Sequence, residues 1–174
     1  MNDILNLEPK NIWKNFADLN EIPRPSKKEE KVREFMIQFG KKLNLETITD
    51  EIANVIIKKP ATKGHENKKT IVLQAHLDMV HQKNNDVDFD FETQGIQMFI
   101  EDDKFVKAKG TTLGADNGIG VAAIMAVLES DEIEHPAIEA LFTIDEETGM
   151  TGAINLDPNI LEGEILLNLD TEDD

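Results

Sequence analysis

Apolar residues recur at intervals of three and four over the first part of the chain, a spacing typical of amphipathic helices. The first helical stretch begins at Pro9 and ends before Pro23 and Pro25. A second stretch follows Ser26 and Glu29, which have the spacing of a capping box. Its apolar stripe, which we expect to face the core, consists of Val32, Phe35, Met36, Phe39 and Leu43. These patterns predict two helices that each bury one side.

Strand patterns follow the two helical stretches. Residues 45–58 predict two strands that are joined by a turn near Asn54. A Lys-rich stretch after them predicts a solvated loop. Residues 96–108 alternate between apolar and polar positions and predict a hairpin that turns at Asp102 and Asp103.

Three short, mainly apolar runs are typical of buried parallel strands, and they lie at residues 71–73, 138–144 and 165–169. Residues 119–128 are apolar nearly all round and predict a buried helix. Strands that alternate with helices in this way predict an α/β fold. We expect three layers, α/β/α, around a mixed, mainly parallel sheet.

Composition and charge narrow the range of functions. At 174 residues and 40% hydrophobic content, the chain can form one domain with a sizeable core. Its net charge of −17 would repel phosphate backbones and anionic lipid surfaces, so we expect neither nucleic acid nor a membrane as a partner. No stretch has the pattern of a signal peptide or of a membrane span.

The chain has no cysteine, so it has no disulfide and no thiolate nucleophile. Any transition-metal site must therefore use imidazole and carboxylate ligands. A chain without cysteine is compatible with a cytoplasmic location, which is the location we expect.

Side chains that can bind metals occur in four short clusters. Three of the clusters directly follow the apolar runs that predict strands. In an open α/β sheet, side chains beyond the carboxyl ends of the strands meet in one crevice although they are distant in sequence. The spacing therefore predicts a single metal site, and its candidate residues are His76 with Asp78, Asp116, Glu146 with Glu147, and Asp170.

The first two clusters each have a simpler explanation. His76 and Asp78 lie on the same face of an extended chain, so Asp78 can orient the imidazole, but the pair could also be a polar strand end. Asp116 lies between Gly114 and Gly118 in a loop of the kind that often binds phosphate, which a carboxylate would repel. Asp116 could bridge two cations, or it could be the N-cap of the following helix.

The later clusters also leave two possibilities open. Asp145, Glu146 and Glu147 are adjacent acids that repel one another unless cations or solvent offset their charge. They could be metal ligands or a solvated turn. Asp170 directly follows an apolar strand pattern and is harder to explain as a surface residue.

Taken together, the motifs resemble a known family. Residues 76–80, 110–120 and 145–149 are similar to the aminoacyl-histidine dipeptidases, also called Xaa-His dipeptidases or peptidase D. These enzymes are a branch of the aminoacylase and carboxypeptidase superfamily of two-metal exopeptidases. The likeness runs from about Leu5 to the last residue, and it implies the catalytic fold of a zinc exopeptidase.

The resemblance implies a role for each candidate metal ligand. His76 and Asp170 would bind one zinc, Glu147 would bind the other, and Asp116 would bridge them. Cobalt or manganese would also suit imidazole with carboxylates. No histidine follows His135, so the second site lacks the final histidine ligand that the family uses.

The resemblance also implies the reaction. A metal-activated water would hydrolyse the peptide bond of a dipeptide of the Xaa-His type, with broad specificity. Glu146 would be the general base, and Asp78 would hold His76 in place.

Members of this family are longer than this chain and form homodimers. The resemblance therefore implies that residues 1–174 are the amino-terminal part of the catalytic domain, without the lid and dimerisation domain and the carboxy-terminal catalytic segment. Such a fragment would be inactive or weakly active alone. It would also expose unpaired sheet edges and could associate with itself.

Other functions remain open from the sequence. A related di-zinc tripeptidase or N-acyl-amino-acid deacylase would share the same metal ligands. A magnesium-dependent phosphoryl-transfer enzyme could use Asp78, Asp116 and Asp170, although His76 fits it poorly because magnesium prefers oxygen ligands. A third class is a non-catalytic binding module that keeps the fold of a peptidase.

Overall fold

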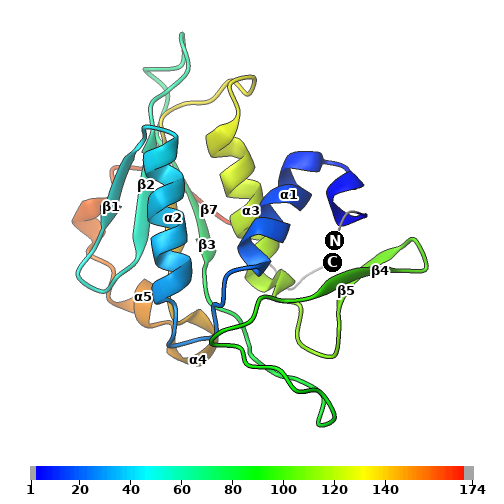
Figure 1. The fold of residues 1–174 in the computed structure, drawn as a ribbon. Helices are drawn as coiled ribbons and strands as arrows, with labels where there is room; N and C mark the ends of the chain where they lie inside the picture. The colour runs from blue at the N-terminus through cyan, green and yellow to red at the C-terminus, as the bar shows by residue number, and fades with distance from the viewer. Residues whose placement is uncertain (1–2, 171–174) are drawn as a thin grey trace.

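A five-stranded mixed sheet forms the centre of the computed structural model, which describes residues 3–170 (Figure 1). In spatial order the strands are β1 (Glu46–Thr49), β2 (Val55–Lys59), β6 (Ile138–Thr143), β3 (Ile71–His76) and β7 (Ile165–Asn168). β3 pairs in parallel with β6 and β7, whereas β2 pairs antiparallel with β1 and β6. The predicted α/β class is therefore confirmed.

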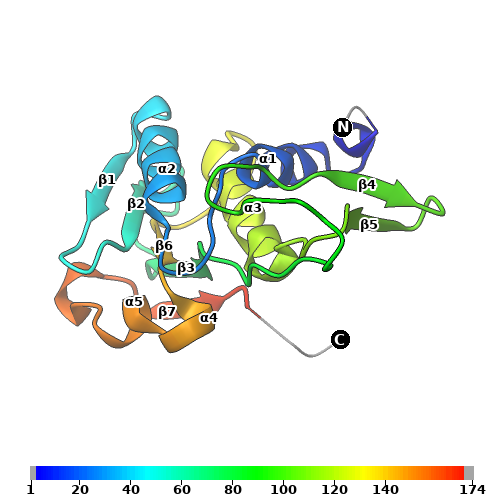
Figure 2. The same ribbon diagram turned by 60° about the horizontal axis from the view of Figure 1, so that its bottom comes forward.

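Helices lie on both faces of this sheet, as expected for three layers. The long helices α1 (Lys10–Asn20), α2 (Glu30–Lys42) and α3 (Ala115–Glu129) cover one face. Figure 2 shows the short helices α4 (Glu146–Gly149) and α5 (Thr151–Ile154) on the opposite side. The remaining short helices are η1 (Ile4–Asn6) and η2 (Pro158–Ile160). Within residues 3–170, none of the helices combines the length and the apolar content needed to cross a bilayer.

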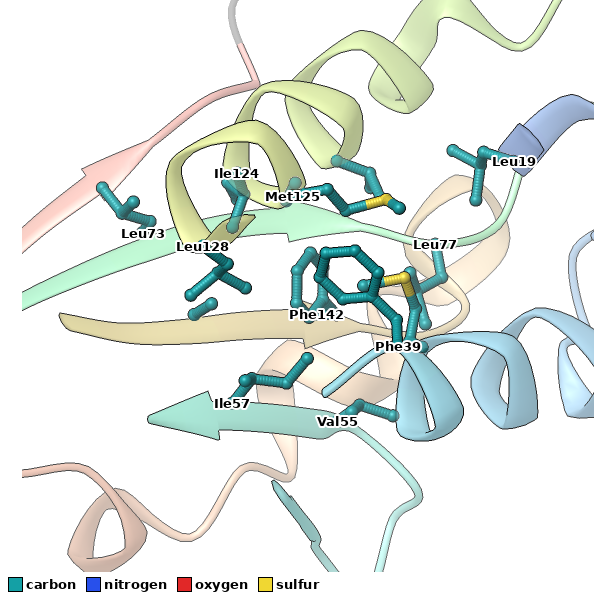
Figure 3. Packing of buried hydrophobic residues seen from close by; sticks show 14 of the residues in the cluster. Leu19, Phe39, Val55, Ile57, Leu73, Leu77, Ile124, Met125, Leu128 and Phe142 are labelled. Atoms are coloured by element: carbon teal, nitrogen blue, oxygen red, sulfur yellow. The ribbon is translucent and has the colours of Figure 1, made fainter. Parts of the chain in front are cut away.

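The main core lies between the sheet and the three long helices (Figure 3). Phe142 of the central strand β6 is fully buried there, together with Met36 of α2 and Ile124 of α3. Full burial of one such side chain contributes roughly 1.5–3 kcal/mol to folding. The two helices predicted from apolar periodicity near the amino end are therefore confirmed, and so is the buried helix between the strands.

A two-stranded hairpin stands apart from the central sheet (Figures 1 and 2). It consists of β4 (Met98–Glu101) and β5 (Phe105–Ala108), which pair antiparallel. Asp102 and Asp103 have φ angles of 52° and 54°, so the hairpin turns where the sequence predicts. Its base packs on a small separate core that includes Met79, Phe89 and Ile96.

The prediction that all three apolar runs are buried is wrong for the last of them. Ile165, Leu166 and Leu167 of β7 are 43%, 61% and 47% exposed. The reason is topological, because β7 lies at the edge of the sheet and pairs only with β3 among the described strands. Self-association through such an edge stays a prediction.

Asn54 connects the turn after β1 with the segment that follows β6. The side chain is fully buried, and its Nδ2 donates to Gly152 O at 2.9 Å while its Oδ1 accepts from Ile144 N at 3.2 Å. Asn54→Ala is expected to lower the free energy of unfolding by about 1–3 kcal/mol, because it leaves buried polar groups without partners. Urea denaturation measures this change.

The matched control for that experiment is Asn155→Ala. Asn155 is exposed, and its Nδ2 donates to Thr151 O at 2.9 Å. Its replacement is expected to change the free energy of unfolding by less than about 0.5 kcal/mol. Equal effects at the two positions would contradict the structural role assigned to Asn54.

Candidate metal centre

The candidate ligands meet where the parallel strands end. His76 is the last residue of β3, Glu146 follows β6, and Asp170 follows β7. His76 Nε2 lies 3.0 Å from Asp116 Oδ1 and 3.8 Å from both Glu146 Oε2 and Asp170 Oδ2. The structure thus brings together side chains that are up to 94 residues apart, in the crevice that the strand order predicts.

His76 is fully buried, and its two ring nitrogens face different partners. Nδ1 lies 3.1 Å from Asp78 O and 3.3 Å from Asp78 Oδ1, which leaves Nε2 directed at the other candidate carboxylates. Burial by itself would lower the pKa of His76, but contacts with Asp78 and Asp116 outweigh it and raise the pKa to about 9. A cation that binds Nε2 must therefore displace a proton.

Asp78 lies behind the imidazole and joins it to the neighbouring turn. Its carboxylate is fully buried and accepts from Glu146 N at 3.0 Å and from Glu147 N at 3.2 Å. Burial acts to raise the pKa of Asp78, but hydrogen bonds from His76 and these donors prevail and lower it. An ionised Asp78 therefore holds the ring and the turn in register.

The predicted capping box at the start of α2 is wrong. Ser26 Oγ donates to Asp78 Oδ2 at 2.7 Å, and the N-cap position of α2 belongs to Glu29. Glu29 Oε1 accepts from Lys27 N at 2.9 Å and from Asp145 N at 3.1 Å. A buried carboxylate without hydrogen-bond donors costs more free energy than an uncapped helix end that water can reach, so the Ser26 hydroxyl donates to Asp78 and not to the end of α2.

Asp116 sits in an irregular first turn of α3. Gly114 begins this turn in a left-handed conformation, and Asp116 has the extended φ and ψ angles of −80° and 116° at a kink before the regular part of the helix. Among the described residues the Asp116 carboxylate contacts His76 and accepts no backbone N–H of α3, so it does not act as the N-cap of this helix. The side chain is 65% exposed and faces His76, which is an accessible position for a bridging ligand.

The acidic turn after β6 is only partly solvated. Asp145 is buried and accepts hydrogen bonds from the hydroxyls of Thr148 and Thr151, so the solvated-turn alternative is wrong for this residue. Glu146 and Glu147 are half-buried. Burial and the neighbouring carboxylates raise the pKa of both side chains, which leaves them sensitive to a nearby cation.

The donor set fits a transition metal. Ligand atoms of His76, Asp116 and Glu147 lie within 4.8 Å of one another, and one imidazole with carboxylates suits zinc, cobalt or manganese. A second group of acids, Glu29, Asp78 and Asp145, is equally close but buried and bonded to protein N–H and O–H groups. Only the first group is open to an ion from solvent.

A hollow of about 350 Å³ opens beside this donor set. Val80, Leu113 and Ala115 line it together with Asp116 and Glu147. A larger hollow of about 520 Å³ lies at residues 49–52 and 155–160 and contains none of the candidate ligands. The smaller hollow is therefore the one that borders the candidate ligands, and it has room for a small molecule next to the carboxylates of Asp116 and Glu147.

Sequence reasoning missed three residues that support the site. Ser26 has the signal of a helix cap, Asp145 has the signal of a surface acid, and Arg24 is a cation between two prolines. Arg24 is only 1% exposed. No local sequence pattern indicates that these side chains are buried. Arg24 and Ser26 contact partners that lie more than 50 residues away in the sequence.

Comparison with known proteins supports a peptidase. The family model described as peptidase family M28 matches residues 54–171. The cytosol non-specific dipeptidase of Escherichia coli strain K12 is 47% identical over 174 residues, which are all of this chain and 36% of that protein. The expected resemblance to dipeptidases is confirmed by this match.

Solved structures agree with the fold. The aminoacylhistidine dipeptidase of Vibrio alginolyticus superposes with a TM-score of 0.95 at 51% identity, over 98% of this chain and 35% of that one. A tripeptidase of Staphylococcus aureus has a TM-score of 0.80 at 22% identity, over 95% of this chain and 44% of that one, and shows the fold alone. The chain spans about a third of the length of the two dipeptidases.

Proposed function

Since the chain belongs to peptidase family M28, we propose that it carries the amino-terminal part of the catalytic domain of a metal-dependent dipeptidase. The observation that carries this proposal is the approach of His76 Nε2 to Asp116 Oδ1, with Glu147 close to both. His76 and Asp170 would hold one zinc, Glu147 would hold the other, and Asp116 would bridge them. Residues 1–174 would therefore supply more ligands for the zinc held by His76 and Asp170 than for the zinc held by Glu147.

Each remaining side chain of the site has a part in this proposal. Ions bound there would polarise the peptide carbonyl and lower the pKa of a bound water toward roughly 7. Glu146 would take the proton of that water and later give it to the leaving amine. Asp78 would keep the imidazole of His76 oriented toward the ions.

The proposed substrate is a dipeptide, with Xaa-His among a broad range. Two of the relatives are named for aminoacyl-histidine and for non-specific dipeptides, and the hollow beside Asp116 has room for a small substrate. The full-length protein would be a cytoplasmic homodimer. Residues 1–174 alone would hydrolyse dipeptides weakly or not at all.

Other classes fit the site less well. A magnesium-dependent phosphoryl-transfer enzyme is disfavoured because the buried imidazole of His76 faces the ligand position and magnesium prefers oxygen. A binding module without catalysis would have no need of a half-buried Glu146 directed at the same position. A tripeptidase or an N-acyl-amino-acid deacylase differs only in substrate, which the experiment below decides.

The test uses the full-length protein after metal removal. Addition of Zn²⁺, Co²⁺ or Mn²⁺ is expected to restore hydrolysis of Ala-His and of dipeptides without histidine. Tripeptides and N-acetyl amino acids, assayed in parallel, are expected to react more slowly. Hydrolysis that survives metal removal, or a preference for tripeptides or N-acyl substrates, would overturn the proposal.

A further inference from the structure

Arg24 is a buried cation at the base of the metal centre. It lies between α1 and α2, and only 1% of its surface is exposed. Nη1 donates to Leu77 O at 3.2 Å and to Asp78 O at 3.3 Å, and Nη2 donates to Gly114 O at 2.6 Å. Nη2 also donates to Asn20 Oδ1 at 3.0 Å, which anchors the guanidinium to the end of α1.

The four acceptors belong to three separate parts of the chain. Leu77 and Asp78 directly follow His76 at the end of β3, and Gly114 precedes Asp116 by two residues. One planar group therefore contacts the backbone on both sides of the closest pair in the site, His76 Nε2 and Asp116 Oδ1. The separation of the two backbone segments, at residues 77–78 and at Gly114, therefore depends on the fixed distance between Nη1 and Nη2 of the guanidinium group.

The glycines that flank Asp116 make room for this group. A Cβ atom on Gly114 would lie 2.5 Å from Arg24 Nη2, and one on Gly118 would lie 2.6 Å from the same nitrogen. Only glycine allows such a close approach. The glycine pattern that resembles a phosphate loop in the sequence thus accommodates a protein cation.

Burial of a cation is unfavourable unless its surroundings compensate it. Burial lowers the pKa of Arg24 to about 10, and the charges of Asp78, Asp116 and Glu147 act in the opposite direction. Arg24 therefore stays charged at neutral pH.

We propose that Arg24 is a positioning residue that sets the separation of His76 and Asp116 and thereby the affinity and geometry of the bound metal. This inference rests on the proposed metal-dependent function. Lysine keeps the charge but cannot replace the fork, because its single ammonium group cannot reach acceptors on both sides at once. The effect is therefore specific to the guanidinium group.

The test compares Arg24→Lys and Arg24→Met with wild type in the full-length protein, with Co²⁺ as the probe. Both variants are expected to bind Co²⁺ roughly 10- to 100-fold more weakly, the usual effect of losing a group that supports metal ligands. The visible spectrum of bound Co²⁺ is expected to change, because the ligand geometry changes. The control is Arg33→Lys on α2, a partly exposed position where binding and spectrum are expected to stay at wild-type values.

Unchanged Co²⁺ affinity and an unchanged spectrum in folded Arg24→Lys would overturn the inference, even if urea denaturation shows lower stability. Should neither Arg24 variant fold, Asn20→Ala removes one of the two acceptors of Arg24 Nη2 instead, together with the bond from Asn20 Nδ2 to Leu113 O. Weaker Co²⁺ binding in that variant supports the inference, and wild-type binding contradicts it. Failure of the wild-type protein to bind Co²⁺ would overturn the proposed function itself, which is a separate result.

Discussion

Glu146→Gln in the full-length protein is expected to lower kcat for dipeptide hydrolysis by roughly 10²- to 10⁴-fold, the usual contribution of a general base. Glutamine has nearly the same shape but cannot accept the proton. The side chain is 31% exposed, and its Oε2 lies 3.8 Å from His76 Nε2, the ring nitrogen that does not contact Asp78. The measurement is steady-state kinetics together with metal analysis.

Metal content is expected to stay the same in this variant. The backbone N–H of Glu146, not its side chain, donates to Asp78 Oδ1 at 3.0 Å, so the support of His76 survives the substitution. Glu132→Gln is the matched control, because Glu132 is exposed in the loop before β6 at the other end of that strand. Full turnover in Glu146→Gln would refute the role of general base, and loss of metal would identify Glu146 as a ligand.

His76→Ala is expected to weaken Zn²⁺ binding by roughly 100-fold or more, exceeding the usual loss for a group that only supports a ligand. His76 supplies the only nitrogen ligand in the proposed set, and its Nε2 is within 3.8 Å of three candidate carboxylates. The substitution also leaves buried Asp78 without its ring partner, so lower stability is expected. Competition with a chromophoric chelator measures the affinity.

The matched control is His81→Ala. His81 lies five residues further along the chain in an exposed loop, where its ring packs edge-on against Phe91. Zn²⁺ affinity is expected to be unchanged in this variant. Equal affinity in wild type and His76→Ala, with unfolding accounted for by circular dichroism, would exclude His76 as a ligand.

Local patterns predicted most of the secondary structure and the meeting of the candidate ligands. A helix with one apolar face and a short apolar strand each leave a periodic signature, so α2, α3 and β6 could be located from residue spacing alone. The convergence of His76, Glu146 and Asp170 followed from one topological rule, because the ends of parallel strands meet at one edge of a sheet.

Burial and side-chain partners required the tertiary structure. The apolar run of β7 resembles a central strand, but its position at the sheet edge leaves Leu166 61% exposed. Ser26 has the spacing of a helix cap, but the fully buried carboxylate of Asp78 competes for its hydroxyl and accepts it at 2.7 Å.

The sequence by itself thus determined the elements, the class of fold and the set of acids and imidazole that could share an ion. Only the tertiary structure decided which strand is an edge, which polar groups are buried, and that Arg24 lies beneath the site. The physical reason is distance along the chain. Periodicity reports interactions within a few residues, whereas Arg24 and its acceptor Gly114 are 90 residues apart and meet only when the sheet has formed.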